Sequence, residues 1–254
     1  MSFDAHFVTT ALVLSVVVAA AAVLRGFTGF GFGLFAVPFA TLFMEPVRAV
    51  PVVLALQLAS GAVTLRSDLG TIDRRSSTFI SAAGLPFVVL GAAMLHLAPQ
   101  SLVRVAVGLI TVGASVALAL APPVRSPRPG RLLTLATGAS SGFLQGLVAM
   151  GGPPLTAFYL RGWFAPAAAR ASMTMVFTVF CAAPLAFSAA AGQIAGHDVA
   201  LAAALLPALV LGTLAGGWIF RRAPGGHRAV ALLALALVGL MAAGRGAMLL
   251  ISGG

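Results

Sequence analysis

The chain has 254 residues, of which 60% are hydrophobic and 8% are charged, whereas soluble domains contain roughly 45–50% and 25% of these classes. So few charges cannot cover a globular surface, so the composition excludes a soluble enzyme, a secreted domain and a disordered chain, and it predicts an all-α polytopic membrane protein. The formal charge of +10 comes from 15 arginines that lie singly or in pairs between apolar runs. We interpret them as anchors at the lipid interface and expect no nucleic-acid partner.

The chain contains ten apolar runs, and we predict that each forms a membrane-spanning segment. The first should remain as a helix rather than be cleaved as a signal peptide, because the N-terminus carries Asp4 and lacks a basic start. Residues 123–131 have the composition of a linker and separate a first repeat, 1–122, from a second repeat, 132–254. The runs cover residues 7–25, 33–44, 47–65, 78–97, 101–121, 132–149, 152–164, 168–191, 199–220 and 228–251.

Short motifs recur in the same order in the two halves. Gly26-Phe27 and Pro38 recur 116 positions later as Gly142-Phe143 and Pro154. Leu85-Pro86 recurs 121 positions later as Leu206-Pro207, and Ala98-Pro99 recurs 125 positions later as Ala223-Pro224. These matches predict an internal repeat, and five crossings in each half would make the two repeats inverted.

The arginines predict the orientation of the segments. With ten crossings, 11 loop arginines lie on one face and 2 on the other; if the short runs 33–44 and 152–164 do not cross, the same residues divide 6 against 7. The positive-inside rule favours the uneven division, with the linker in the cytoplasm and both termini in the periplasm. The larger group is Arg66, Arg74, Arg75, Arg125, Arg128, Arg131, Arg161, Arg170, Arg221, Arg222 and Arg228, and the smaller group is Arg48 and Arg104.

Each short run follows a glycine-rich segment, one from Gly26 to Gly33 and one from Gly142 to Pro154. Tight packing of small residues is one interpretation of such a segment. The other is a helix break that lines a substrate site, because short segments interrupted by glycine or proline at matching places in two halves indicate such sites in transporters. A new helix after each break would direct its positive N-terminal end at the break, and two such ends would form an anion site near the centre.

The polar residues favour an anion over a cation. All five acidic residues fall in loops or at the ends of runs, whereas cation carriers usually place a carboxylate inside a span. Arg25 adjoins the first break and could attract an anion, with snorkelling to the interface as the alternative. Gln57 and Gln145 could contact substrate or join helices. Cys181 is the single cysteine and cannot form an internal disulfide. Because no catalytic set or metal-ligand spacing occurs, we expect no enzyme, metal or cofactor.

These segments together resemble the sulfite exporter TauE/SafE family, also called TSUP and formerly DUF81. The similarity is carried by the first glycine motif leading to Val37-Pro38, by the second leading to Gly151-Gly152-Pro153-Pro154, and by the two Leu-Pro…Leu-Gly segments, and it covers essentially the whole chain. It implies a bacterial inner-membrane permease for sulfite, sulfonates or other small organic anions. It also implies that residues 26–33 and 142–154 form the substrate region, although Gln145 and Leu147 stand where the first half has Gly29 and Gly31.

We therefore predict a secondary transporter that exports small anions such as sulfite or organosulfonates by alternating access, with the anion and the lipid bilayer as its partners. Two alternatives are an anion channel on the same scaffold and a membrane subunit or scaffold without transport of its own. The predicted hinge or helix-break residues are Pro38, Pro86, Pro154 and Pro207. The predicted substrate-binding residues are Arg25, Gly26, Phe27, Thr28, Gly29, Gly31, Gly33, Gln57, Gly142, Gln145, Gly151, Gly152 and Pro153.

Overall fold

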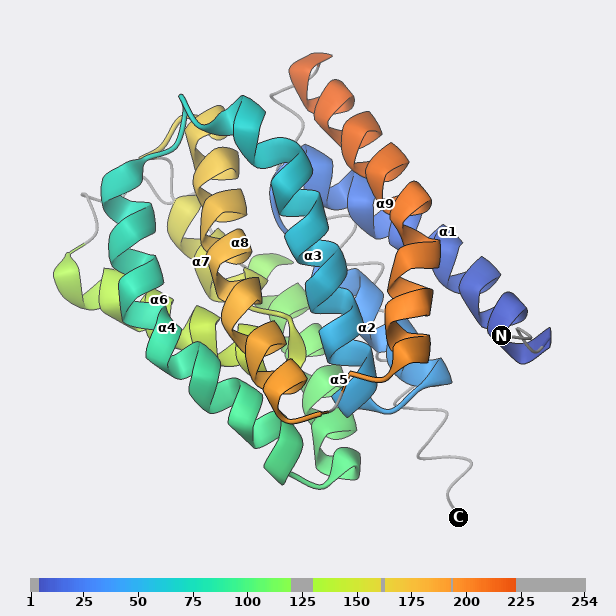
Figure 1. Cartoon of the computed structure of the whole chain (residues 1–254). Coiled ribbons are helices and arrows are strands. Elements are labelled where there is room, and N and C mark those ends of the chain that lie inside the picture. The colour runs from blue at the N-terminus through green and yellow to red at the C-terminus, as the bar shows by residue number, and fades with distance from the viewer. Residues whose placement is uncertain (1–4, 120–129, 161–162, 193, 223–254) are drawn as a thin grey trace.

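A computed structural model describes residues 5–119, 130–160, 163–192 and 194–222, and these residues form nine helices and no strands (Figure 1). The all-α prediction is therefore confirmed for this part of the chain. The helices are α1 (Ala5–Thr28), α2 (Phe32–Phe43), α3 (Pro46–Asp68), α4 (Arg74–Leu97), α5 (Gln100–Ala119), α6 (Arg131–Val148), α7 (Gly152–Tyr159), α8 (Pro166–Ala190) and α9 (Gly196–Arg222).

Nine of the ten predicted runs coincide with these helices, and their ends differ by a few residues. The largest difference is in α7, which ends at Tyr159 instead of continuing to residue 164. The apolar run is longer than the helix because Trp163 and Phe164, which follow α7, pack back on Phe158, each with a ring-centroid distance of 6.1 Å. The tenth run, 228–251, and linker residues 123–129 lie outside the described residues.

Five of the described helices are long and apolar enough to cross a membrane. Two shorter apolar stretches lie in α2 and α5. The described part is thus that of a multi-pass membrane protein, whereas the count of ten crossings stays a prediction. The five long stretches are Thr9–Thr28, Pro46–Arg66, Arg74–Leu97, Pro166–Ala190 and Gly196–Arg222.

Three of the four predicted hinge prolines lie inside continuous helices. α2, α4 and α9 run through Pro38, Pro86 and Pro207 respectively, so the helices are not broken there. One proline removes a single backbone hydrogen bond, and the helices packed around it hold the segment together. A hinge role for these three residues stays a prediction. Pro154 lies with Pro153 in the first turn of α7, where a missing amide costs no hydrogen bond.

Glycines allow two pairs of long helices to pack closely, α1 along α9 and α4 along α6 (Figure 1). A side chain on Gly26 would collide with the Thr213 carbonyl oxygen in α9. In the other pair, a side chain on Gly146 would collide with the Val88 carbonyl oxygen in α4. Small residues therefore set the distance between the helices of each pair.

Both predicted breaks are present. After α1 ends at Thr28, Gly29 and Gly31 adopt left-handed backbone angles, with φ of 84° and 89°, and α2 begins at Phe32. After α6 ends at Val148, Ala149 adopts a left-handed conformation with φ of 56°, and α7 begins at Gly152. A left-handed residue terminates a helix because it turns the chain away from the helix axis.

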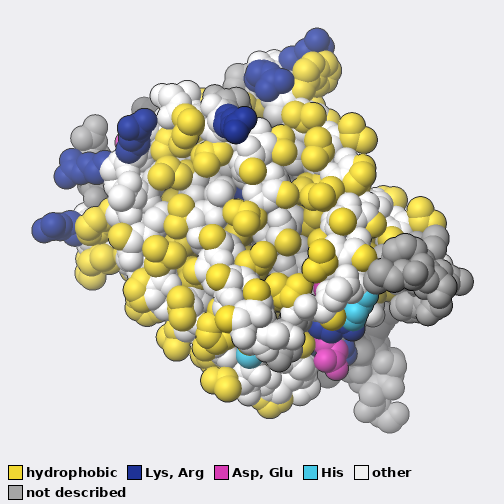
Figure 2. All heavy atoms as spheres, viewed as in Figure 1, with side chains coloured by type: hydrophobic (Ala, Val, Ile, Leu, Met, Phe, Trp, Pro, Cys, Tyr) yellow, Lys and Arg dark blue, Asp and Glu magenta, His cyan; other side chains and the backbone are white. Residues whose placement is uncertain are grey.

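Apart from Arg25, the charged side chains of the described residues gather at two ends of the molecule. Arg170 pairs with Asp68, which joins the start of α8 to the end of α3, and Arg48 pairs with Asp198, which joins the starts of α3 and α9. Figure 2 shows arginine side chains along the upper and left margins and a separate group of acidic, basic and histidine side chains at the lower right. We call the first the arginine-rich end; its described arginines are Arg66, Arg74, Arg75, Arg131, Arg170, Arg221 and Arg222.

Candidate anion site

The N-terminal ends of α2 and α7 meet at a small buried cavity of about 10 Å³, which we call the central cavity. From the first break it is lined by residues 30–34, and from the second by Ala149, Met150 and Gly152. Arg25 in α1, Gln57 in α3 and Phe177 in α8 complete the lining. The two glycine-rich segments, which are far apart in the sequence, therefore come together.

Arg25 supplies the positive charge at the central cavity. Its side chain is 3% exposed, so it does not snorkel to the interface. Nη1 donates to Gln57 Oε1 over 3.2 Å, while Nε and Nη2 are buried without a hydrogen-bond partner among the described residues. Its guanidinium carbon lies 5.7 Å from the centre of the Phe177 ring. Since burial of a charge is costly unless it is paired, two unused donors at a cavity indicate a site for an anion.

Gln57 and Gln145 connect the two breaks. Gln57 Nε2 donates to the Ala149 carbonyl oxygen over 3.0 Å, and Gln145 Nε2 donates to Gln57 Oε1 over 3.2 Å. Gln145 Oε1 accepts a 2.9 Å bond from the Gly151 amide. Ser141 Oγ donates to the Gly151 carbonyl oxygen over 2.6 Å. Both glutamines are almost fully buried, at 2% and 0% exposure, so this network fixes the start of α7 relative to α3.

The first turn of α2 presents backbone donors to the cavity. The first hydrogen bond of this helix runs from the Phe35 amide to the Gly31 carbonyl oxygen. The amides of Phe32, Gly33 and Leu34 precede it, so the helix offers them no acceptor. All three residues line the central cavity. Together with the N-terminal end of the helix dipole, they favour a negatively charged ligand.

The other predicted residues serve the breaks or the packing around them. Thr28 Oγ1 donates to the Leu24 carbonyl oxygen and accepts from the Phe30 amide, which shapes the first break. Phe27 packs edge-on against Phe220 in α9, with ring centroids 6.1 Å apart. Gly26 and Gly142 contact α9 and α4, and Gly29 packs against Arg170. None of these five is among the described residues that line the cavity.

Two side chains at the site come from α8 and had no assigned role in the sequence. Phe177 lines the cavity. Cys181 is fully buried, and its Sγ lies 3.4 Å from Gln145 Nε2, so it belongs to the same polar cluster. The one usable signal was the spacing of four residues between them, which places both on one face of a helix. Arg161, which follows the second short run, lies outside the described residues.

Comparison with known proteins identifies the family. The family model for the sulfite exporter TauE/SafE matches residues 14–242. The chain belongs to this family. A curated relative from Cupriavidus necator (strain H16), the "Probable sulfite/organosulfonate exporter TauE", is 31% identical over 194 residues, which cover 74% of this chain and 76% of the relative. No solved structure matches the chain. TauE/SafE proteins are membrane transporters and not enzymes.

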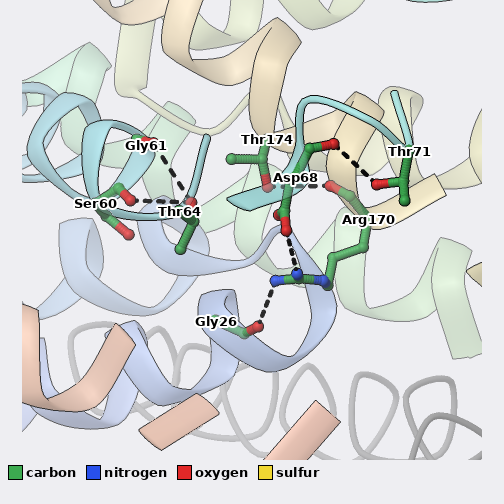
Figure 3. A network of polar contacts seen from close by, with 8 residues as sticks. All are labelled: Gly26, Ser60, Gly61, Thr64, Asp68, Thr71, Arg170 and Thr174. Carbon is green, nitrogen blue, oxygen red and sulfur yellow. Dashed lines mark hydrogen bonds and ion pairs between the residues drawn. The ribbon is translucent and has the colours of Figure 1, made fainter. Parts of the chain in front are cut away.

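In this TauE/SafE protein a buried ion pair joins four helices at the arginine-rich end. Figure 3 shows Arg170 between Asp68 and Gly26. Arg170 Nη2 lies 2.8 Å from Asp68 Oδ1, and Nη1 donates to the Gly26 carbonyl oxygen over 3.0 Å. The two charged side chains are 11% and 8% exposed, and the guanidinium carbon lies 4.7 Å from the centre of the Phe220 ring. Arg170 therefore ties α8 to α3, to α9 and to the backbone beside Arg25.

A second ion pair lies at the opposite end of the molecule. Arg48 Nη2 is 2.7 Å from Asp198 Oδ1, and Arg48 Nε donates to the same carboxylate over 3.2 Å. Asp198 is 2% exposed, and the half-exposed His197 ring lies 3.2 Å from it. This pair holds the starts of α3 and α9 together. The central cavity thus lies between two charged contacts, one at each end of the molecule.

Proposed function

We propose that this TauE/SafE protein is a bacterial inner-membrane exporter of sulfite or organosulfonates that binds its substrate at the central cavity. The observation that carries the proposal is the Arg25 guanidinium, which is buried at that cavity with two unused donor nitrogens. No carboxylate belongs to the described residues that line the cavity, so the charge of Arg25 is left for the ligand. The name of the relative from Cupriavidus necator supports the substrate class.

A sulfite-like oxyanion suits the donors at this site. It could accept hydrogen bonds from Arg25 and from the amides of the first turn of α2. Charge-assisted bonds of this kind are about twice as strong as neutral ones. A metal cation or a cationic amine would meet only repulsion from Arg25 and from the helix N-termini. These groups therefore support selection for negative charge, and the sulfur oxyanion is the class proposed for this chain.

Alternating access is the mechanism we propose. The central cavity of about 10 Å³ holds roughly one water molecule, so it must widen to admit an oxyanion. The ion pairs Arg170–Asp68 and Arg48–Asp198 stand at opposite ends and would have to separate in turn. A narrow, buried site between two such contacts favours a carrier over a channel, because a channel opens to both sides at once.

We also propose that the two halves are inverted repeats, and paired contacts of α1 with α9 and α4 with α6 support this. A side chain on Gly91 would meet the Phe143 carbonyl oxygen and the Leu147 amide. A side chain on Gly216 would meet the Val23 carbonyl oxygen and the Phe27 amide. Gly216 follows Gly91 by 125 positions, and Phe143 and Leu147 follow Val23 and Phe27 by 120. The left-handed residues Gly29 and Ala149 also lie 120 positions apart.

The proposed orientation places the arginine-rich end in the cytoplasm and both termini in the periplasm. The described arginines of the opposite end are Arg48 and Arg104, so the positive charges divide unevenly, as the positive-inside rule requires. An inside-negative membrane potential drives an anion outward by about 2.3 kcal/mol per charge per 100 mV. Export in this orientation therefore needs little coupling to another ion.

A topology assay tests the orientation and the number of crossings. A reporter that is active only in the cytoplasm should be active when fused after Arg128, and a periplasmic reporter should be active when fused after Gly254. A cytoplasmic C-terminus would contradict ten crossings and, with them, the inverted repeat.

A flux assay with purified protein in liposomes tests the function. Wild-type protein should exchange labelled sulfite for unlabelled sulfite in a saturable manner. Arg25→Gln should lower this flux by about a hundredfold, because a hydrogen bond to a charged group contributes about 1.5–3 kcal/mol, and Arg25→Lys should lie between the two. Arg104→Gln, an exposed arginine on α5, is the matched control. Non-saturable flux without exchange would identify a channel, and the absence of flux would favour a non-transporting subunit.

A further inference from the structure

We propose that the arginine-rich end carries a second binding site, for organic anions with an apolar body, where an exported organosulfonate docks before it reaches the central cavity. This inference rests on the proposed function. The site is a cavity of about 570 Å³, which we call the vestibule. Its volume falls within the roughly 300–1,000 Å³ of small-molecule sites, whereas the central cavity measures about 10 Å³. The lining residues are Asp73, Arg75, Ser76, Phe79, Arg131, Thr134, Phe158, Trp163 and Phe164.

The charged groups of the vestibule favour an anion. Arg75 in the first turn of α4 and Arg131 at the start of α6 both line it and are exposed, so both guanidinium groups can meet a ligand from solvent. Asp73 also lines it, but its Oδ1 accepts a 2.8 Å bond from the Ser76 amide and caps α4. Among the described residues that line the vestibule, two cations against one capping carboxylate leave a positive balance. Guanidinium groups match the oxygens of a sulfonate or carboxylate geometrically.

The aromatic groups of the vestibule favour a ligand with an apolar body. Four of the nine described lining residues are aromatic, and they come from α4, α7 and the segment that follows α7. Phe158 and Trp163 pack edge to face, with ring planes at 74°, which fixes part of this wall. Inorganic sulfite has no apolar group to place there. An organosulfonate could place its head on an arginine and its body against the rings, which is the usual composition of a small-molecule site.

The short helix α7 extends from the central cavity to the vestibule. α7 has eight residues and is therefore about 12 Å long. Its first residue, Gly152, lines the central cavity, and Phe158 near its other end lines the vestibule. The hydroxyl of buried Tyr159 lies 3.0 Å from Ser76 Oγ and 3.3 Å from Ser77 Oγ, which ties this end of α7 to α4. A movement of α7 would therefore change the walls of both cavities at once.

Tryptophan fluorescence can detect occupation of the vestibule. The chain has two tryptophans, so Trp218→Phe leaves Trp163 as the reporter in the vestibule wall. The protein is titrated in phosphatidylcholine nanodiscs with 4-nitrobenzenesulfonate, an anion whose ring quenches tryptophan. Quenching should be saturable, and the neutral 4-nitrobenzenesulfonamide should not reproduce it. Arg75→Gln and Arg131→Gln should each raise the half-saturating concentration about tenfold.

Arg74→Gln is the matched control, because Arg74 is the exposed neighbour of Arg75 and does not belong to the described lining of the vestibule. Equal effects of Arg74→Gln and Arg75→Gln, or no effect of either vestibule substitution, would overturn the proposal. An anionic phospholipid headgroup has the same charge chemistry. If nanodiscs that contain phosphatidylglycerol abolish the quenching, the vestibule is a lipid site and the organic-anion assignment fails.

Transport kinetics separate this proposal from the proposed function. In liposomes, Arg75→Gln/Arg131→Gln should raise KM for an organosulfonate with little change in kcat, since docking precedes the transport step. If wild-type protein transports the organosulfonate and the double variant has the same KM, the proposed vestibule site is wrong and the proposed transport function is retained. If wild-type protein transports no anion but Trp163 is still quenched, the function fails and the vestibule stands.

Discussion

The two breaks have the same backbone plan but offer different groups to a ligand. The break between α1 and α2 offers the amides of the first turn of α2 and the free nitrogens of Arg25. At the break between α6 and α7, Gln145 occupies the Gly151 amide, and Pro153 and Pro154 have no amide hydrogen. Among residues 151–154, only Gly152 could donate to a ligand through its backbone.

From this difference we predict that an anion is held mainly by the first half of the chain. Aligned by their left-handed residues, the two breaks place Gln145 at the position of Arg25, 120 residues later. One half therefore has a cation where the other has a neutral amide that fixes the local backbone. We therefore propose that the first break binds the anion and that the second break provides a rigid helix start.

The largest expected effect concerns the lack of room for a side chain at both breaks. Gly31→Leu and Gly151→Leu should each abolish sulfite efflux while the protein still reaches the membrane. A side chain at Gly31 would be strained by its φ of 89°, and a Cβ atom at Gly151 would lie 3.0 Å from the Gln145 Cβ atom. Efflux is measured against the amount of protein in the membrane.

Gly108→Leu is the matched control, because a side chain at Gly108 in α5 would have no atom within 4 Å. It should transport like wild type. Normal efflux by both break variants would mean that neither glycine belongs to the site or to a hinge. Loss in one variant only would show that the two breaks are not equally required.

Much of this arrangement follows from the local sequence. Glycine and proline determine where a helix can begin and end, so the two breaks and the start of α7 were predictable from residues 26–33 and 142–154. The number of positions that separates the two breaks was harder to determine from the sequence. Gly138, Gly142 and Gly146 recur every four residues, so a shift of one turn still aligns glycines, and the motif match of 116 differs from the structural offset of 120 by one turn.

Contacts between distant helices could not be predicted from local pattern. Phe177 and Cys181 belong to an apolar run, and only the packing of α8 beside α3 brings them to Arg25 and Gln145. The glycine motifs also combine two roles that composition does not separate. Gly31 and Gly33 line the cavity, whereas Gly26 and Gly142 serve helix packing, because the outcome depends on which helix face meets a neighbour.

A smaller effect should follow from exchanging the side chains of Arg25 and Gln145. Arg25→Gln alone removes the cation. In Arg25→Gln/Gln145→Arg a cation returns at the matching position of the second break, and sulfite flux should recover about tenfold over the single variant. Recovery stays below wild type because α7 provides fewer amide donors. Flux in liposomes measures it, with Gln145→Arg alone as the control. A double variant no better than Arg25→Gln would show that the two positions are not interchangeable.

The smallest expected effect concerns the backbone of the left-handed residues. Ala149 has φ of 56°, where an L-residue pays about 1–2 kcal/mol. Ala149→Gly removes this cost. It also raises the conformational entropy of the unfolded chain, which lowers stability by about 0.4–1 kcal/mol, so a modest rise in Tm is expected. The Ala149 carbonyl oxygen, which accepts the bond from Gln57, is retained.

Gly29→Ala should lower Tm, because it adds left-handed strain at φ of 84° and places a methyl group 2.9 Å from the Arg170 Cγ atom. Thermal unfolding of both variants in detergent tests this opposition. Shifts of the same sign would show that the left-handed geometry does not govern stability at the breaks.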